Sequence, residues 1–271
     1  MRNPLTVCIM LLAGLWLAGC AGDRRAVADR LATGAGLQPV SIETGIHRIQ
    51  AWRRLAAPEQ PATVYIEGDG LAWLDRHRPS RDPTPLNPVG LALASRDTAA
   101  NVIYLARPCM YGVDDSRCSI PVWTERQFDE PAVAALDRAL DQLKQPGQRL
   151  HLVGYSGGAA MAAALAARRG DVASLRSVAG NLDPAAVNRF HSVTPLPAAI
   201  DVAALAPRLA RLPQLHFTGT GDRIVPGTIV TRFARAAGPC AAVVSVQADH
   251  ARGWEEAWPR LLQMPLPCSS N

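Results

Sequence analysis

Residues 154–158 read Gly-Tyr-Ser-Gly-Gly, which places a serine between glycines two positions before and two positions after it. An apolar run at 150–153 precedes this pentapeptide and an alanine-rich run at 159–165 follows it, so we expect a strand, a tight turn and a helix. In such a turn only glycine leaves room for the strand and helix to approach. The pattern predicts that Ser156 projects as a nucleophile, the alternative being an ordinary turn in which it caps the helix.

A serine hydroxyl needs a general base, and a group that orients this base, before it can attack at neutral pH. Of the six histidines, His250 alone follows the last predicted strand, at 241–246. It is the candidate base, the alternative being an exposed loop histidine. Asp222, in the glycine-rich segment 218–226 after the penultimate predicted strand, is the candidate acid. Asp183 is a rival acid, and a serine–histidine pair without an acid is a further alternative.

These side chains lie far apart in the sequence, so a sheet must bring them together. Short apolar segments rich in branched residues are typical of parallel strands that are covered on both faces. Strand and helix signals alternate, which predicts an α/β fold with a mostly parallel sheet flanked by helices. The predicted strands are 63–67, 101–106, 149–153, 175–179, 214–218 and 241–246, preceded by a half-exposed strand at 46–52.

Two helices can be placed from the sequence. One is expected to begin after Asp129, a suitable N-cap, and to end before Pro146. The other, near the C-terminus, carries Trp254, Trp258 and Leu261 at spacings that place them on one face. We interpret these tryptophans as core anchors rather than ligand contacts.

The order Ser156, Asp222, His250, each on the loop at the C-terminal end of a strand, is the order that α/β-hydrolases use. Over residues 63–262 the chain resembles an α/β-hydrolase, and with Cys20 it resembles the bacterial α/β-hydrolase lipoproteins. The resemblance implies an α/β-hydrolase fold in which these three residues form a catalytic triad.

The surroundings of the expected site are less defined. The connection 183–212 has room for a small cap only. Many relatives have glycine directly after the histidine, where this chain has Ala251. The segment 109–118 should overhang the site, so Tyr111 or Trp123 could contact substrate, although either could equally be a packing residue.

The resemblance also implies two backbone N–H groups that stabilise an oxyanion. One belongs to Gly157, and the other comes from the loop after the strand at 63–67. In the family this loop often begins His-Gly, whereas here Glu67 precedes Gly68. We place the second donor on Asp69, with Gly70 as the alternative; a plain glycine turn would explain the same residues.

The N-terminus has the pattern of a bacterial export signal. Arg2 precedes an almost unbroken apolar segment at 5–17, which is too short for a spanning helix. The following Leu-Ala-Gly-Cys resembles a lipobox, which implies cleavage before Cys20 and lipid on its thiol; the alternative is a plain signal peptide. Ala21 favours the outer membrane, with the protein facing the periplasm. The expected division is a signal peptide at 1–19, a lipidated tether at 20–38 and a hydrolase domain at 39–271. Residues 21–38 are rich in alanine, glycine and arginine, so a frayed first helix is the alternative to the tether there.

Composition and charge exclude some functions. The 271 residues are 48% hydrophobic and 19% charged, as in ordinary globular proteins. The net charge is +5 at pH 7, and the arginines are scattered without a basic block. We therefore expect no nucleic-acid partner.

The cysteines fit an exported protein. Apart from Cys8 and Cys20, four remain, and an even number predicts disulfides. Of the three possible pairings we favour Cys109 with Cys118 and Cys240 with Cys268, because each closes the shorter loop. No spacing typical of zinc ligands occurs, so no metal is expected.

Taken together, the residues and the resemblance predict a lipid-anchored serine hydrolase of small-molecule esters or related acyl compounds that needs no cofactor. A peptidase or thioesterase would use the same residues. A non-catalytic protein that uses this fold to bind an envelope partner is the alternative from a different class.

Overall fold

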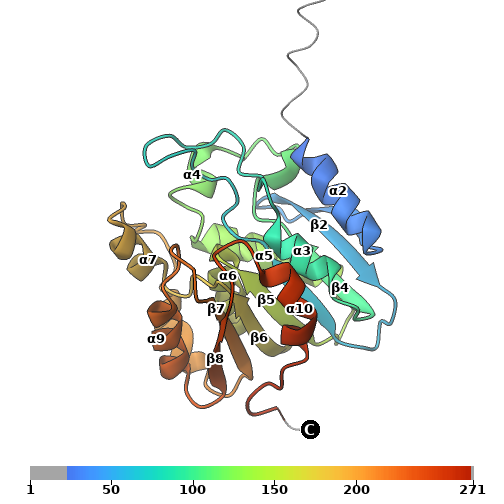
Figure 1. The fold of residues 1–271 in the computed structure, drawn as a ribbon. Helices are drawn as coiled ribbons and strands as arrows, with labels where there is room; N and C mark the ends of the chain where they lie inside the picture. The colour runs from blue at the N-terminus through green and yellow to red at the C-terminus, as the bar shows by residue number, and fades with distance from the viewer. Residues whose placement is uncertain (1–22, 270–271) are drawn as a thin grey trace, which may run out of the picture.

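The computed structural model describes residues 23–269, so the expected signal peptide and Cys20 lie outside the described residues. An eight-stranded sheet forms the middle layer, with helices on both faces (Figure 1). The strands are β1 (Gln38–Glu43), β2 (Arg48–Leu55), β3 (Ala62–Ile66), β4 (Asn101–Leu105), β5 (Leu150–Tyr155), β6 (Val172–Val178), β7 (Gln214–Gly219) and β8 (Ala241–Val246). Their order across the sheet is β1-β2-β4-β3-β5-β6-β7-β8. Only β2 runs against its neighbours, so the predicted mostly parallel sheet is confirmed.

Helices divide between the two faces of the sheet. The helices are α2 (Arg24–Gly34), α3 (Val89–Ser95), α4 (Ile120–Trp123), α5 (Glu130–Leu143), α6 (Gly157–Arg168), α7 (Pro184–His191), α8 (Val202–Leu205), α9 (Gly227–Ala237) and α10 (Trp254–Leu262), with 3-10 turns η1 (Met110–Gly112) and η2 (Ala206–Leu209). One buried cluster joins α5, α6, α8 and α9 to the sheet. A second joins α2, α3 and α10 to the other face. None of the described helices is both long and apolar enough to cross a membrane.

The N-terminal part of the domain differs from the sequence interpretation. Residues 20–38 were expected to form a lipidated tether, with a frayed first helix as the alternative for 21–38. Arg24–Gly34 is a helix that Asp23 caps by accepting from the N–H of Arg25. Ala28 and Ala32 are fully buried. Because alanine contributes so little apolar area, the packed face of α2 gives a weak periodic signal in the sequence. The edge strand β1 was also missed, since only one of its residues is buried.

The two helices placed from the sequence are confirmed. The Asp129 carboxylate accepts from the N–H of Ala132 and caps α5, which ends at Leu143. Trp254 and Trp258 of α10 are fully buried, in agreement with their interpretation as core anchors.

The connection between β6 and β7 is short. It carries α7, α8 and η2 and no larger domain, as expected for a small cap. At the C-terminal end of α7 the carbonyl of His191 accepts from Arg76, at 3.1 Å from Nη2. The Nε2 atom of His191 lies 2.7 Å from the carbonyl of Ile224. The cap is therefore linked to loops on either side of it.

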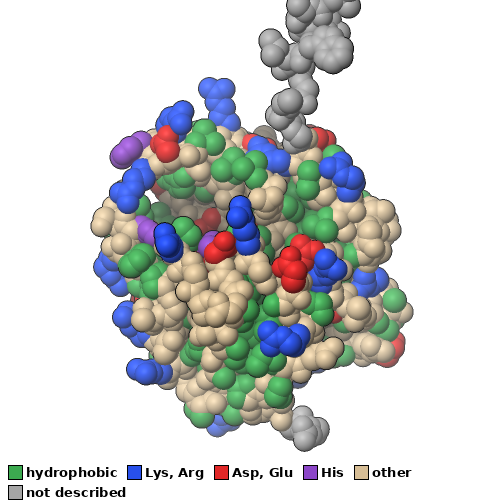
Figure 2. All heavy atoms as spheres, viewed as in Figure 1, with side chains coloured by type: hydrophobic (Ala, Val, Ile, Leu, Met, Phe, Trp, Pro, Cys, Tyr) green, Lys and Arg blue, Asp and Glu red, His purple; other side chains and the backbone are tan. Residues whose placement is uncertain are grey.

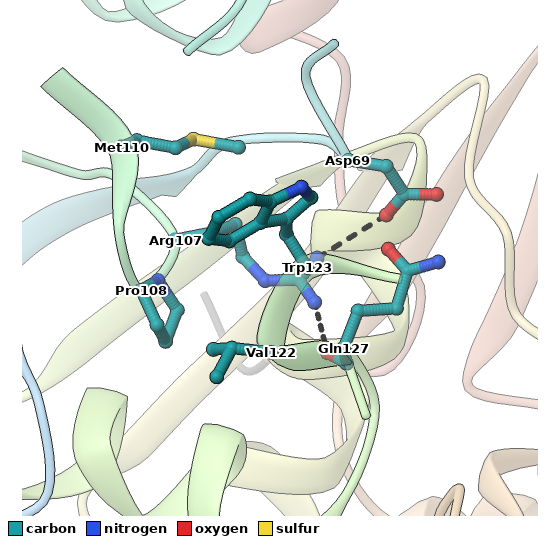
Figure 3. Close-up of a pocket in the computed structure, with 7 residues that line it drawn as sticks. All are labelled: Asp69, Arg107, Pro108, Met110, Val122, Trp123 and Gln127. Carbon is teal, nitrogen blue, oxygen red and sulfur yellow. Dashed lines mark hydrogen bonds and ion pairs between the residues drawn. The ribbon is translucent and has the colours of Figure 1, made fainter. Parts of the chain in front are cut away.

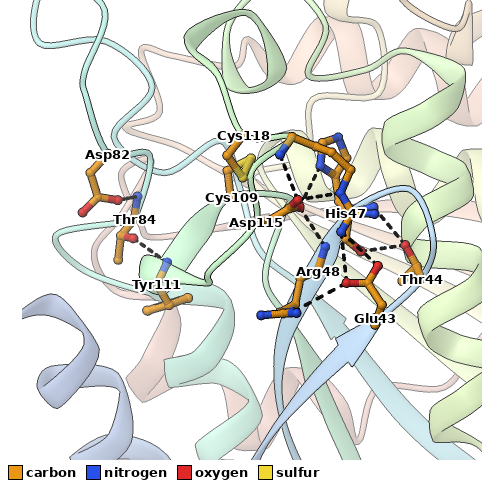
Figure 4. Close-up of a disulfide and its surroundings, with 11 residues drawn as sticks. Glu43, Thr44, His47, Arg48, Asp82, Thr84, Cys109, Tyr111, Asp115 and Cys118 are labelled. Carbon is orange, nitrogen blue, oxygen red and sulfur yellow. Dashed lines mark hydrogen bonds and ion pairs between the residues drawn. A yellow bond between two sulfur atoms is a disulfide. The ribbon is translucent and has the colours of Figure 1, made fainter.

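The four cysteines of the described domain pair as expected. Cys109 and Cys118 are joined across a nine-residue separation (Figure 4). Cys240 and Cys268 are joined across 28 residues. Among the described residues, His47 lies close enough to the first disulfide to suggest a metal-ligand group, but its two sulfur atoms are already bonded to each other.

Candidate active site

Ser156 occupies a sharp turn between β5 and α6. Its φ of 49° and ψ of −124° are unusual for a residue other than glycine. A Cβ atom at Gly154 would lie 2.4 Å from Cα of Ala159, and one at Gly158 would lie 2.2 Å from the carbonyl oxygen of Ile66. Both glycines are therefore required by close backbone approach, as the pentapeptide predicts. The surrounding packing holds the serine in a strained conformation, which is typical of functional sites.

Three side chains from distant loops meet at this turn. The Oγ atom of Ser156 lies 3.0 Å from Nε2 of His250. On the other side of the ring, Nδ1 lies 2.9 Å from Oδ2 of Asp222. The Asp222 side chain is only 1% exposed, and that of His250 is 19% exposed. This arrangement allows the imidazole to take a proton from the serine while the carboxylate fixes its tautomer.

The Asp222 carboxylate is held rigidly by its own loop. Its Oδ1 atom accepts from the N–H groups of Ile224, at 2.8 Å, and Val225, at 2.9 Å. Burial by itself would raise the pKa of this carboxyl, but the hydrogen bonds from His250 and the two backbone groups bring its pKa below the ordinary value. Asp222 is therefore ionised at neutral pH, as an orienting acid must be.

Asp183, the rival acid, has a different place. Its Oδ1 atom accepts from the N–H of Ala186 at 2.8 Å and caps α7. Among the described residues its carboxylate has no hydrogen bond with His250, whose Nδ1 faces Asp222. Only one of the two candidate acids is thus positioned beside the base.

The loop that carries His250 is fixed by aromatic side chains. The hydroxyl of Tyr155 donates to the carbonyl of His250 at 3.1 Å. The indole N–H of Trp254 is shared between the carbonyls of Asp249, at 2.8 Å, and His250, at 3.1 Å. Ala251 fits this loop without needing glycine, because its φ is not positive, and its N–H donates to the Asp249 carboxylate. The sequence interpretation treated Trp254 as packing alone and missed its second contact.

The two backbone N–H groups predicted to bind an oxyanion are those of Gly157 and Asp69. Among the described residues, neither the N–H of Gly157 nor that of Asp69 has a hydrogen-bond acceptor. The loop that carries Asp69 follows β3 and is fixed by Glu67, whose carboxylate accepts from the N–H of Gly68 at 2.9 Å. The alternative donor, Gly70, has a φ of +64°, packs against Pro83 and lines the same cleft as Ser156.

Glu67 itself is a buried acid that the sequence interpretation left without a role. Burial raises the pKa of its carboxyl, although the N–H of Gly68 and the hydroxyl of Tyr104 donate to it. The Tyr104 hydroxyl lies 2.9 Å from Oε2 of Glu67, and the Tyr111 hydroxyl lies 3.1 Å from that of Tyr104. Glu67 therefore anchors the loop to the core. A glutamate directly after a buried apolar strand is the signal that could have found it.

The Asp69 side chain lies close to Gly157. A Cβ atom at Gly157 would lie 1.8 Å from Oδ1 of this carboxylate. The same oxygen is 3.3 Å from Nη1 of Arg107, whose side chain is only 5% exposed and also donates to the carbonyl of Gln127. Burial raises the pKa of the Asp69 carboxyl, although Arg107 and His250 favour its charged form.

Arg107 is a second residue that sequence reasoning missed. It lies two residues after β4, at the same edge of the sheet as Ser156, and an arginine at the end of a buried apolar run was the available signal. Its guanidinium lies 5.1 Å above the ring of Phe128, and its Nε atom has no partner among the described residues. Burial lowers the pKa of this guanidinium, while Asp69 opposes the shift. The buried cation compensates the charge of Asp69 next to the nucleophile.

Ser156 and His250 lie at the base of a cleft of about 420 Å³. Its upper walls are mostly apolar and include Leu71, Leu86 and Ile224. Figure 2 shows a hollow in this part of the surface, with acidic side chains inside it and basic side chains around it. The cleft is large enough for a small organic substrate.

The two aromatic residues considered as substrate contacts lie outside this cleft. Tyr111 is buried against Trp52, with ring centroids 4.9 Å apart, and is therefore a packing residue. Trp123 borders a small adjoining cavity of about 10 Å³ with Asp69 and Arg107 (Figure 3), and its indole N–H donates to the carbonyl of Ser80.

Comparisons with known proteins agree with this geometry at the level of the fold. No protein-family model and no curated protein sequence matches the chain. The structure is similar to that of an α/β serine hydrolase homologue from Coxiella burnetii, with 19% identity, a TM-score of 0.57 and coverage of 83% of this chain and 96% of that one. It is also similar to a bacterial membrane phospholipase A, with 17% identity, a TM-score of 0.61 and coverage of 95% of both chains. The esterase domain of a Rhodothermus marinus protein gives 17% identity, a TM-score of 0.55 and coverage of 83% and 94%.

These similarities identify the fold. The chain has the α/β-hydrolase fold, and the described domain covers nearly the whole length of each of these structures. At such low identities the activity has to be argued from the residues of this chain.

Proposed function

We propose that this protein is a serine hydrolase that cleaves carboxylic esters or related acyl bonds. One observation carries the proposal: a single imidazole, that of His250, lies within hydrogen-bond distance of both the Ser156 hydroxyl, at 3.0 Å, and the Asp222 carboxylate, at 2.9 Å. The open cleft above the serine supports the same conclusion, as do the N–H groups of Gly157 and Asp69, which have no acceptor among the described residues.

The reaction follows from these positions. The Ser156 oxygen attacks the carbonyl carbon of the substrate while Nε2 of His250 takes its proton. The carbonyl oxygen becomes negative and is bound by the N–H groups of Gly157 and Asp69. When the intermediate collapses, the protonated imidazole gives its proton to the leaving alcohol and an acyl-serine remains. Water, deprotonated by the same imidazole, then attacks the acyl group, releases the acid and restores the hydroxyl of Ser156.

Asp222 and Arg107 support this reaction through the residues that they contact. The Asp222 carboxylate keeps the proton of the neutral imidazole on Nδ1, so that Nε2 faces the serine. Arg107 balances the charge of Asp69, which would otherwise repel the developing oxyanion. Both effects depend on side chains that are shielded from water.

Labelling with a fluorophosphonate tests the proposal directly. We expect the folded protein to form an adduct on Ser156 that mass spectrometry locates, and Ser156→Ala to form none. Folded wild-type protein that stays unlabelled would contradict the proposal and favour a non-catalytic binding role for the fold.

Substrate panels decide between the enzyme classes that share these residues. Aryl esters, acyl thioesters and peptide amides should be assayed with the wild type beside Ser156→Ala. We propose esters as the preferred class, since an esterase domain and a membrane phospholipase A are among the proteins of similar structure. A higher kcat/KM for amides or thioesters would replace the ester assignment without removing the triad.

We further propose that lipid on Cys20 anchors the protein to the bacterial cell envelope, facing the periplasm, with Ala21 favouring the outer membrane. Two or more acyl chains are needed for stable membrane attachment. Labelled palmitate should be incorporated in cells by the wild type and not by Cys20→Ser. Recovery of the unsubstituted protein without lipid would contradict this proposal.

A further inference from the structure

Large apolar side chains gather around the opening of the cleft. Leu86 and Ile224, which are 60% and 48% exposed, line the cleft. Phe190 is 58% exposed near the end of α7, and Trp73 and Leu74 are 45% and 54% exposed in the connection between β3 and α3. We call these five side chains the rim.

Hydrogen bonds show that the rim is one surface rather than scattered residues. The loop of Trp73 and Leu74 reaches α7 through the contact of Arg76 with the carbonyl of His191. The residue before His191 is Phe190, and the ring of His191 binds the carbonyl of Ile224. The segments that carry the rim residues are thus joined to one another beside the cleft that Leu86 and Ile224 line. A patch of this kind on a folded domain marks an interaction site.

The charge around the rim is positive. The exposed acids in the same segments are Asp75, which is paired with Arg78 at 2.6 Å, and Asp249. Basic side chains also surround the hollow in Figure 2. The exposed arginines next to rim residues or to the His250 loop are Arg76, Arg78, Arg189, Arg223 and Arg252. Apolar side chains bordered by arginines are complementary to a bilayer that carries anionic lipid headgroups.

The start of the described chain lies on the same side of the molecule. Arg24, in the first turn of α2, pairs with Asp82 at 2.5 Å and also donates to the carbonyl of Thr84, close in sequence to Leu86 (Figure 1). The proposed anchor, Cys20, precedes Asp23 by three residues, which span at most about 11 Å when fully extended. Lipid on Cys20 would therefore hold this side of the molecule near the membrane.

We propose that the rim docks on an anionic lipid surface, with its apolar side chains among the headgroups and the neighbouring arginines against lipid phosphates. The cleft then opens toward the bilayer. The inference goes beyond the proposed activity, because it rests on the surface around the opening and does not require Ser156 to react.

Trp73 provides a probe that is independent of activity. The other tryptophans of the described residues are buried, so a brominated lipid that reaches the headgroup region should quench Trp73 selectively. The full chain is reconstituted into phosphatidylcholine vesicles with and without phosphatidylglycerol, and quenching is compared between the wild type and Trp73→Phe. We expect the wild type to be quenched at least twofold more than Trp73→Phe in the anionic vesicles.

Matched variants separate docking from general hydrophobicity and charge. Arg76→Gln combined with Arg78→Gln should reduce the Trp73-dependent quenching at least twofold, as should high salt. Arg235→Gln and Ile120→Ser, which change an exposed arginine and an exposed apolar residue outside the rim, should leave it unchanged.

Two results would overturn the proposal. One is equal quenching of the wild type and Trp73→Phe in both kinds of vesicle. The other is a lipid-free dimer that Leu74→Ser converts to a monomer, which would make the rim an interface between two copies. Fluorophosphonate labelling of Ser156 is scored separately, so a failure of docking and a failure of the hydrolase assignment are distinguished.

Discussion

Two serine–histidine pairs in this protein have almost the same contact distance and very different surroundings. Ser156 and His250 lie 3.0 Å apart at the cleft, and Ser177 and His216 lie 2.9 Å apart inside the sheet. At the cleft, the second ring nitrogen faces the Asp222 carboxylate. In the interior, Nε2 of His216 has no partner among the described residues. A hydrogen bond between serine and histidine is therefore not sufficient for a reactive serine.

The two pairs differ in the orientation of the imidazole and in the access of substrate. His216 is fully buried, and burial lowers its pKa to about 4, so it stays neutral at physiological pH. It has neither a carboxylate to fix its tautomer nor a route for substrate. Ser156, by contrast, lines an open cleft, where a strained backbone conformation between flanking glycines holds it in place. An acid, a cleft and oxyanion donors together distinguish a catalytic pair from a structural one.

Removing each serine in turn should give the largest contrast. Ser156→Ala should lower kcat/KM for an aryl ester by roughly 10⁴-fold or more, since among the described residues no other serine, threonine or cysteine lines the cleft. Ser177→Ala should keep the activity and lower only stability, because it removes one buried hydrogen bond. Initial rates and fluorophosphonate labelling are measured for both variants. Equal losses of activity in the two variants would contradict the proposed difference between the two serine–histidine pairs.

The two acids offer a second contrast. Asp222→Asn should lower kcat by about 10⁴-fold, because an amide in that position favours the wrong imidazole tautomer. Asp183→Asn should leave kcat unchanged, since asparagine also caps helices well. Steady-state kinetics of the two purified variants provide the measurement, with circular dichroism to check that both are folded. An active Asp222→Asn protein would argue for a serine–histidine pair without an acid.

The interior histidine should appear in the pH dependence of stability. Its folded pKa of about 4 lies below the usual histidine value, so between these two values the unfolded chain binds more protons than the folded one. The contribution of this group to the free energy of unfolding is therefore complete above the unfolded pKa of about 6.5 and is lost as the pH falls toward 4. The expected loss is roughly 3 kcal/mol. Urea unfolding at pH 7 and pH 4.5 tests this.

A variant assigns that loss to His216. In His216→Gln the difference between the two pH values should shrink, because the group that must be protonated is gone. His191→Gln, at a partly exposed position, should show the wild-type difference. If all three proteins lose the same stability, another group is responsible.

The smallest expected effect concerns the charge beside the nucleophile. Arg107→Met should lower kcat by about tenfold to a hundredfold, because Asp69 would then place an uncompensated negative charge beside the oxyanion. Adding Asp69→Asn to this variant should restore part of the loss, whereas Arg96→Met, which breaks an exposed ion pair with Glu255, should have no effect on kcat. A double variant no better than Arg107→Met would show that the arginine acts on folding alone.

Much of the fold was predictable because it depends on local patterns. The strands from β3 to β8 are short apolar runs, and each was expected within a few residues of its observed bounds. The helix α2 was expected only as an alternative to a tether, and the edge strand β1 was not expected, since their contribution to the core comes from small or half-exposed side chains that a hydrophobic pattern does not register.

Glycine at 154 is required by local backbone geometry, because a Cβ atom there would meet Ala159, whereas glycine at 158 makes room for the carbonyl of Ile66 on a distant strand. The sequence by itself determined the turn at Ser156 through the glycine pattern of 154–158. It also placed His250 and two candidate acids after strands, because strand signals are local as well. Only the tertiary structure decided which acid faces the histidine, since Asp222 and Asp183 each follow a strand and differ in what the folded chain brings beside them. The same holds for Arg107, whose partner Asp69 is distant in sequence and becomes its neighbour only when β3 and β4 pair in the sheet.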